Sequence, residues 1–354
     1  MYTVAGRLVD RFGVRIGATV CVAWWSISSM LTGFARGPMS LALFRGLLGI
    51  GEPGIFPAGV KACGEWFPPK MRALATGIFS SGSAVGAVLA APIVVALTHH
   101  FGWRLAFVLP GFLGLLWIPL WLRIYHHPSK HPAVKPSELE ALDAGEVEEN
   151  KPTWREILQK RHVWGLVLAR IASDPVWYFY LFWLPDYLQR VRNLSLTEIG
   201  LYGWIPFLFA DLGCVCGGAI SDKLVRRGWS AIRARFATLL GVALLAPFGV
   251  FIGSVESTVG AIVITCMITF LCQAWSTVIA TLSTEVSAPS ERATVLGLMG
   301  TAGSLGGLLF AQLLGFTIGK FGYSSAFAMA AVMHPVGFII LFVQFRHLLS
   351  RKVS

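Results

Sequence analysis

Long apolar stretches dominate the chain, and short polar segments separate them. A stretch of about 20 apolar residues is long enough to cross a hydrocarbon core about 30 Å thick. The pattern therefore predicts an all-α membrane protein with about ten transmembrane helices. The expected spans are residues 16–35, 39–62, 73–97, 104–124, 162–187, 198–220, 234–254, 258–283, 292–317 and 324–345.

The basic residues are distributed unevenly between alternate loops. One set of loops, together with the C-terminus, holds 22 of the 29 Lys and Arg residues, and the opposite loops hold five. Because cytoplasmic loops carry an excess of Lys and Arg, we expect a multi-pass protein of the inner (plasma) membrane with its C-terminus in the cytoplasm. The predicted cytoplasmic loops are residues 7–15, 61–72, 123–161, 221–235 and 284–292.

The composition supports the membrane assignment. Hydrophobic residues make up 55% of the chain and charged residues only 13%, whereas soluble domains carry about 25% charged residues. The net charge of +11 lies in short loops rather than on one face of a domain, which argues against nucleic acid as a partner. No catalytic triad, metal-ligand cluster or phosphate-binding glycine loop stands out, so we expect no enzyme, no cofactor and no metal. We expect a monomer in the lipid bilayer.

The one long hydrophilic segment, residues 125–161, divides the chain. It contains several prolines and an acidic run, a composition that predicts a cytoplasmic linker. Four predicted spans precede it and six follow it. We therefore expect an N-terminal helical bundle at 1–124 and a six-helix bundle at 162–354.

A short signature, G-x-x-x-D-[RK], occurs once on each side of the linker at a predicted cytoplasmic helix end. Two copies in equivalent places favour duplicated halves over ordinary basic loops. In each copy, an Asp near a helix end that pairs with an Arg of the neighbouring bundle would form a breakable latch between conformations. The latch residues are Gly6, Asp10, Arg11, Gly13 and Arg15 in the first copy, and Gly218, Asp222 and Lys223 in the second.

Arg45 and Glu52 lie within one predicted span, and ionisable groups inside a bilayer are functional candidates by default. They are seven residues apart, so they share a helix face about 10 Å apart along the axis. Arg45 could hold an anionic solute, and a buried Glu52 could take up and release a proton near neutral pH. The alternative is a structural ion pair that tethers helices.

Arg170 and Asp174 form a second candidate pair because residues four apart face each other on a helix. Pro175 follows and would bend the helix. Trp177 and Tyr180 come next and could contact a sugar, or they could be ordinary aromatic packing.

Other polar positions within spans are Asp211, whose role stays open, and the patches that contain Ser83 and Gln273, Trp275 and Ser276. We expect Ser83, Gln273, Trp275 and Ser276 to contact substrate, although such side chains often serve only as hydrogen-bonding links between helices.

The paired signatures resemble those of the major facilitator superfamily, which has twelve helices in two halves. The Arg45–Glu52 helix, followed by Glu65-Trp-Phe-Pro68, is similar to the anion:cation symporter family. The stretch from Asp174 to Pro185, with Ala210-Asp211-Leu-Gly213 and Gln273-Ala-Trp-Ser276, looks like its hexuronate transporters. Aligned in this way, the chain lacks helix 1 and most of helix 2.

The resemblance implies proton-coupled uptake of glucuronate, galacturonate or a related sugar-acid anion. In that mechanism Glu52 loads the proton, and Arg45 binds the sugar acid together with Gln273 and Trp275. Two alternatives stay open. One is another organic anion on the same fold, such as an aldonate, aldarate, tartrate or aromatic acid, and the other is a truncated remnant that does not transport.

Overall fold

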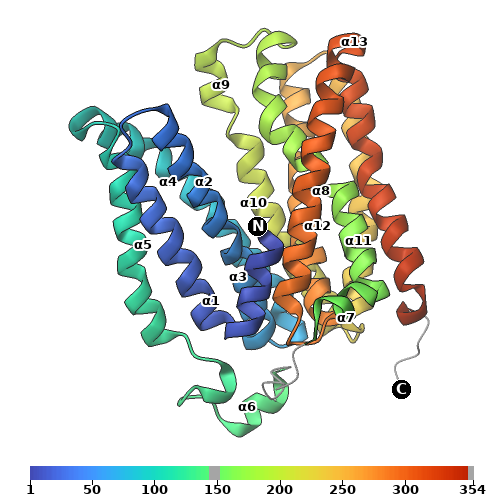
Figure 1. Ribbon diagram of the computed structural model, residues 1–354. Helices are drawn as coiled ribbons and strands as arrows, with labels where there is room; N and C mark the ends of the chain where they lie inside the picture. The colour runs from blue at the N-terminus through green and yellow to red at the C-terminus, as the bar shows by residue number, and fades with distance from the viewer. Residues whose placement is uncertain (143–151, 350–354) are drawn as a thin grey trace. The chain divides into compact units, whose positions relative to one another are not determined.

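Helices form all the regular secondary structure of residues 1–142 and 152–349, which are the residues that this computed structural model describes (Figure 1). Within a bilayer every backbone N–H and C=O must find its partner inside the protein, and a helix achieves this within one segment. The predicted all-α class is therefore confirmed. Residues 143–151 of the expected linker, including most of its acidic run, and residues 350–354 at the C-terminus lie outside the described residues.

The chain divides into two compact units. Each unit takes one short segment from the other side of the expected linker, so the units are not contiguous in sequence. The division into domains 1–124 and 162–354 remains a prediction. Unit 1 comprises Met1–Pro68, Gly82–Thr153 and Ser287–Leu298, and unit 2 comprises Pro69–Ser81, Trp154–Val286 and Met299–Ser354.

The first helix, α1 (Tyr2–Gly33), packs along α5, α2 and α3 in unit 1. It bends at Gly13, whose φ of 81° is readily available only to glycine. The first turns of α4 belong to unit 2. The other elements before the linker are α2 (Pro38–Gly51), η1 (Glu52–Gly54), α3 (Ile55–Trp66), α4 (Pro69–Phe101), α5 (Leu105–Ile124), η2 (Pro128–Lys130) and α6 (Pro136–Ala141).

In unit 2, α12 (Thr258–Val286) is the central helix, packed against α8, α10 and α11. The last helix, α13, bends at Gly322, where φ is 76°. The remaining elements are α7 (Trp154–Gln159), α8 (Arg161–Arg190), α9 (Leu196–Tyr202), α10 (Ile205–Arg226), α11 (Ala231–Leu245), η3 (Ala246–Gly253) and α13 (Arg292–Leu349).

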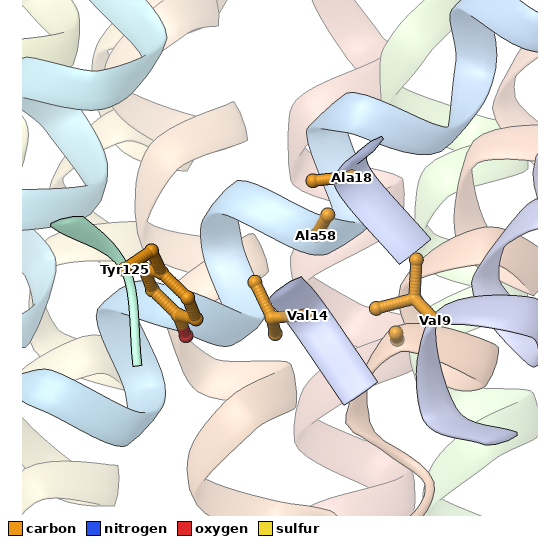
Figure 2. Close-up of a cluster of buried hydrophobic side chains, with 6 residues drawn as sticks. Val9, Val14, Ala18, Ala58 and Tyr125 are labelled. Atoms are coloured by element: carbon orange, nitrogen blue, oxygen red, sulfur yellow. The ribbon is translucent and has the colours of Figure 1, made fainter. Parts of the chain in front are cut away.

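A small apolar cluster holds the lower part of unit 1 together. Figure 2 shows Val14 and Ala18 of α1 gathered with Ala58 of α3 and with Tyr125, which directly follows α5. Val9 and Ala293 complete the cluster. It lies beside the first signature, so it fixes the position of that segment.

Every expected span coincides with helix, but the number that cross the bilayer remains a prediction. Six helical segments among the described residues are long and apolar enough on their own. The expected span at 39–62 is divided by η1 into helices of 14 and 12 residues, neither of which could cross a bilayer alone. The spans expected at 292–317 and 324–345 are the two arms of α13 on either side of Gly322.

Candidate substrate and coupling sites

Glu52 lies at a helix break in unit 1. Pro53 has no backbone N–H and interrupts the α-helical hydrogen bonding, and Glu52–Gly54 forms a 3₁₀ turn between α2 and α3. Glu52 is exposed, so the expectation of a buried carboxylate is wrong. Its side chain borders a cavity of unit 1. The cavity has a volume of about 250 Å³ and is lined by Trp25, Ser29, Leu48, Glu52, Ile55, Pro110 and Gly111.

Arg45 is an exposed cation on α2. Its guanidinium carbon lies 5.9 Å from the centroid of the Phe107 ring. Among the described residues no ion pair joins Arg45 to Glu52, because two helical turns separate them by about 10 Å. The structure therefore does not support the alternative of a helix-tethering pair. Ser83 is also exposed, on α4 of the same unit.

Arg170 and Asp174 form the ion pair that their spacing predicts. Nε of Arg170 lies 3.0 Å from Oδ2 of Asp174. The same guanidinium donates a hydrogen bond from Nη1 to the Ser276 hydroxyl of α12, with a distance of 3.0 Å. The candidate pair, Arg170 and Asp174, therefore lies in contact with Ser276, an expected substrate ligand, in unit 2.

Tyr180 and Trp275 occupy the core of unit 2 rather than a binding surface. Tyr180 is 2% exposed and packs on Phe179 and Phe327. Trp275 is 1% exposed and meets the His334 ring edge to face at 5.2 Å. Neither is accessible to a solute in this conformation, and direct substrate contact by these two residues stays a prediction.

Two other expected ligands of unit 2 stay partly accessible. Trp177 is half-buried and its ring lies edge to face with Phe207, 5.9 Å between centroids. Gln273 is half-buried on α12, one turn before Ser276. Asp211 is half-buried on α10 and makes no hydrogen bond or ion pair within the described residues. All three can still reach a solute.

The first signature forms a buried helix cap in unit 1. The Asp10 carboxylate accepts hydrogen bonds from the backbone N–H groups of Ala293 and Thr294, at 3.1 and 2.6 Å. These are the second and third residues of α13, whose free N–H groups and helix dipole favour an anion. Lys61 of α3 supplies the counter-charge, with 2.5 Å between Nζ and Oδ1. The expected Arg partner is therefore wrong for Asp10, because the cation that reaches it is Lys61.

The second signature repeats this arrangement in unit 2. The Asp222 carboxylate accepts from the N–H groups of Ala73 and Leu74 near the start of α4, at 3.3 and 2.8 Å. Here the cation is Arg235, whose Nη1 lies 2.7 Å from Oδ1 of Asp222. The predicted residue type is right, but Arg235 lies on α11 of the same unit rather than on a neighbouring bundle. Arg235 also binds the Glu285 carboxylate at 2.8 Å.

The two leading glycines of the signatures allow each helix to come close enough for its cap. A Cβ at Gly6 would overlap the carbonyl oxygen of Ala293, and a Cβ at Gly218 would overlap that of Ala73. A larger residue at either position would force the capped helix away from its aspartate.

The basic members of the signatures have separate roles. The Arg15 guanidinium donates to the Leu122 carbonyl at the end of α5, and Arg11 lies over the exposed Phe12 ring, 5.6 Å from its centroid. Lys223 is exposed. None of the three binds a signature aspartate in the described structure.

Sequence reasoning missed the partners of the two aspartates, although the sequence carries a signal for them. The pattern E-x-x-x-P-x-x-R-A begins at Glu65 and again at Glu285. Each copy ends on a residue whose N–H binds a signature aspartate, namely Ala73 and Ala293. Lys61 lies one turn before the first copy, and Arg235 lies on α11.

Glu65 is buried beside the start of the linker. The Tyr125 hydroxyl donates to its carboxylate at 2.9 Å. Burial raises the pKa of the Tyr125 phenol, and the neighbouring Glu65 charge raises it further. The phenol therefore stays neutral and remains a donor at any physiological pH.

Known proteins resemble this chain along most of its length. The hexuronate transporter of Escherichia coli (strain K12) is 33% identical over 352 residues, which covers 96% of this chain and 81% of that protein. The galacturonate transporter of Dickeya chrysanthemi is 35% identical over 225 residues, which covers 62% of this chain and 65% of that protein.

The fold has its counterpart among solved structures. The human organic anion transporter MFSD10 superimposes with a TM-score of 0.75 at 14% identity, covering 96% of this chain and 80% of that one. At such low identity the likeness concerns the fold alone. The family model described as Major Facilitator Superfamily matches residues 1–311. The chain is therefore an integral membrane transporter rather than an enzyme, and it belongs to the major facilitator superfamily.

Proposed function

We propose that this chain is a secondary active transporter that takes up a hexuronate, or a related sugar-acid anion, together with a proton by alternating access. The observation that carries the proposal is the similarity to a hexuronate transporter over 96% of the chain. The exposed Arg45 and the cavity-lining Glu52 support it, because one offers a cation to a carboxylate and the other a site for a proton.

The proposal gives each accessible side chain a role. Arg45 binds the substrate carboxylate, since guanidinium can hold a carboxylate through two hydrogen bonds. In unit 1, Ser83 supplies a hydrogen-bonding group. In unit 2, Trp177 supplies an aromatic face for a sugar, and Gln273 and Ser276 supply hydrogen-bonding groups. Glu52 takes up the coupled proton from the solution that fills its cavity.

The two aspartate caps serve as the conformational latches. Each cap joins helix ends from opposite sides of the linker, so any rearrangement that separates those helix ends must break it. We place the caps and the C-terminus in the cytoplasm, as the distribution of basic residues favours. Protease accessibility of a C-terminal tag in sealed cells and in inverted vesicles would test that orientation.

The coupling role is tested with the purified full chain in lipid vesicles. We expect uptake of labelled D-glucuronate to rise with an inward proton gradient. Glu52→Gln should keep exchange of labelled for unlabelled glucuronate while losing accumulation against a gradient. The matched control is Glu256→Gln, which neutralises an exposed carboxylate in the loop before α12 and should leave both activities unchanged. Accumulation that survives in Glu52→Gln would remove Glu52 from this role.

Substrate class is tested with a competition panel in the same vesicles. Hexuronates should compete with labelled glucuronate more strongly than aldonates, aldarates, tartrate or aromatic acids. Preference for one of the latter would assign a different organic anion to the same fold. A well-folded protein that exchanges no member of the panel would favour the non-transporting remnant.

A further inference from the structure

Three polar side chains lie along one face of α8, at four-residue intervals. Arg170, Asp174 and Tyr178 all turn toward neighbouring helices of unit 2. Arg170 reaches Ser276 of α12 at 3.0 Å, and the Tyr178 hydroxyl lies 3.4 Å from the Ser304 hydroxyl of α13. A continuous polar face is therefore enclosed between α8, α12 and α13.

Glycines of α13 make room for this face. A Cβ at Gly303 would overlap Oδ2 of Asp174, and a Cβ at Gly307 would overlap the Tyr178 ring. Asp174 is thus held against the α13 backbone at one position, where it meets Arg170. The structure places the pair at a fixed site rather than on a free helix surface.

The pair of Arg170 and Asp174 is mostly, but not completely, buried. The Arg170 and Asp174 side chains are 11% and 15% exposed, so part of the pair's surface remains accessible. Each charge depends on the other, because an enclosed charge without its counter-ion costs several kcal/mol. Arg170 donates a hydrogen bond from Nη1 to Ser276, whereas its Nε lies 3.0 Å from Asp174 as an ion pair without a hydrogen bond. The guanidinium has five N–H donors in all.

A solute carboxylate could occupy the same guanidinium in a two-point contact. Two carboxylates around one cation would repel each other, however, and the repulsion disappears when one of them takes a proton. Among the described residues, the other polar groups that face Asp174 are the Ser173 hydroxyl of α8 and the Cys272 thiol of α12. Neither supplies a second cation.

We propose that Arg170 is a second binding group for the carboxylate of the transported anion, and that Asp174 is its exchangeable counter-ion. A proton adds to the Asp174 carboxylate, the ion pair with Arg170 opens, and the substrate carboxylate takes the place of Asp174. Release of the substrate and of the proton restores the original pair. The proposal rests on the proposed function in one respect, namely that the solute is a carboxylate anion.

The first test measures binding of D-glucuronate to the full chain in vesicles from acidic to alkaline pH. It uses the Glu52→Gln background, so that the pH dependence no longer includes Glu52. We expect affinity to fall as pH rises in that background. Adding Asp174→Asn should give high affinity at every pH, and adding Arg170→Gln should weaken binding at least about tenfold, the equivalent of about 1.4 kcal/mol.

Two further variants sharpen the result. Asp186→Asn is the matched control, because Asp186 pairs with Arg190 at the same spacing on the same helix but at its exposed end, and it should leave the pH profile unchanged. Arg170→Lys keeps the charge without the two-point geometry and should bind with intermediate affinity. An unchanged pH slope in Asp174→Asn, or full affinity in both Arg170 variants, would overturn the proposal.

The second test needs no substrate. A membrane-permeant carbodiimide modifies protonated carboxyl groups, and mass spectrometry locates the modified residue. Asp174 should be modified at acidic pH and spared at alkaline pH in the wild-type chain. No modification of Asp174 at acidic pH would refute the exchangeable counter-ion. If modification follows pH but glucuronate does not bind, the proposed substrate fails while the proton exchange at Asp174 stands.

Discussion

The Asp10→Asn substitution removes one negative charge and keeps the shape of the side chain. In the folded chain this carboxylate binds Nζ of Lys61 and the N–H groups of Ala293 and Thr294. Lys61 is itself buried, so the substitution leaves an uncompensated charge inside unit 1. Breaking a buried ion pair by removing one partner costs about 3–5 kcal/mol. We therefore expect Asp10→Asn to destabilise the protein by that amount.

Thermal unfolding of the detergent-solubilised chain measures this cost. At about 2 °C per kcal/mol for a large chain, the midpoint should fall by roughly 6–10 °C. Arg190→Gln is the control, because it removes an ion pair whose Arg side chain is 75% exposed, and such pairs contribute about 0–1 kcal/mol. Its midpoint should stay within about 2 °C of the wild type.

A second substitution separates charge burial from other causes. Lys61→Met added to Asp10→Asn removes the stranded charge, so the double variant should be more stable than Asp10→Asn alone. The reasoning fails if the unfolding midpoint of Asp10→Asn equals that of the wild type. It also fails if Lys61→Met makes Asp10→Asn less stable, since the penalty would then not come from a buried cation.

Two other substitutions have expected outcomes. Arg235→Met should lower the unfolding midpoint at least as much as Asp10→Asn does, because it removes the cation that two buried carboxylates share. Arg235→Lys should recover part of the loss. Gly303→Ala should reduce glucuronate binding or folding because the new Cβ overlaps Asp174, whereas Gly46→Ala, which meets nothing within 4 Å, should be neutral in both respects. A Gly303→Ala protein that binds like the wild type would show that the Asp174 carboxylate can move at little cost.

The helical architecture could be predicted because the membrane leaves few alternatives. A stretch of about 20 apolar residues has one structure that satisfies its backbone in lipid, so hydropathy alone located the helices. The kinks at Gly13 and Gly322 were not predicted. Their cause is a local positive φ, and nothing in the apolar pattern distinguishes these two glycines from the many that are helical.

Some of the candidate site residues were predicted correctly and others were not. Sequence spacing determines which residues share a helix face, but not which neighbouring helix that face contacts. The contact between Arg170 and Asp174 depends only on the geometry of the helix that carries both residues, and their pairing was predicted. Tyr180 and Trp275 depend on which surface α8 and α12 bury, and the aromatic pattern suits a core as well as a cavity. Glu52 was expected to be buried because it lies in an apolar run, but the helix break at Pro53 places it beside an open cavity.

The two aspartate caps are alike in geometry but differ in the cations that neutralise them. Among the described residues, the cation paired with Asp10 is Lys61. Asp222 shares Arg235 with Glu285, and Arg235 also donates to the Pro69 carbonyl at the start of α4. Releasing α4 breaks this bond and the two to Asp222. Releasing α13 also breaks three bonds, because the Thr294 hydroxyl donates to Asp10 at 2.6 Å in addition to the two N–H groups. Each such charge-assisted bond is worth about 1.5–3 kcal/mol. The hydrogen bonds that open with each helix are therefore equal in number, and the two caps differ in the partners of their cations rather than in how many bonds must break.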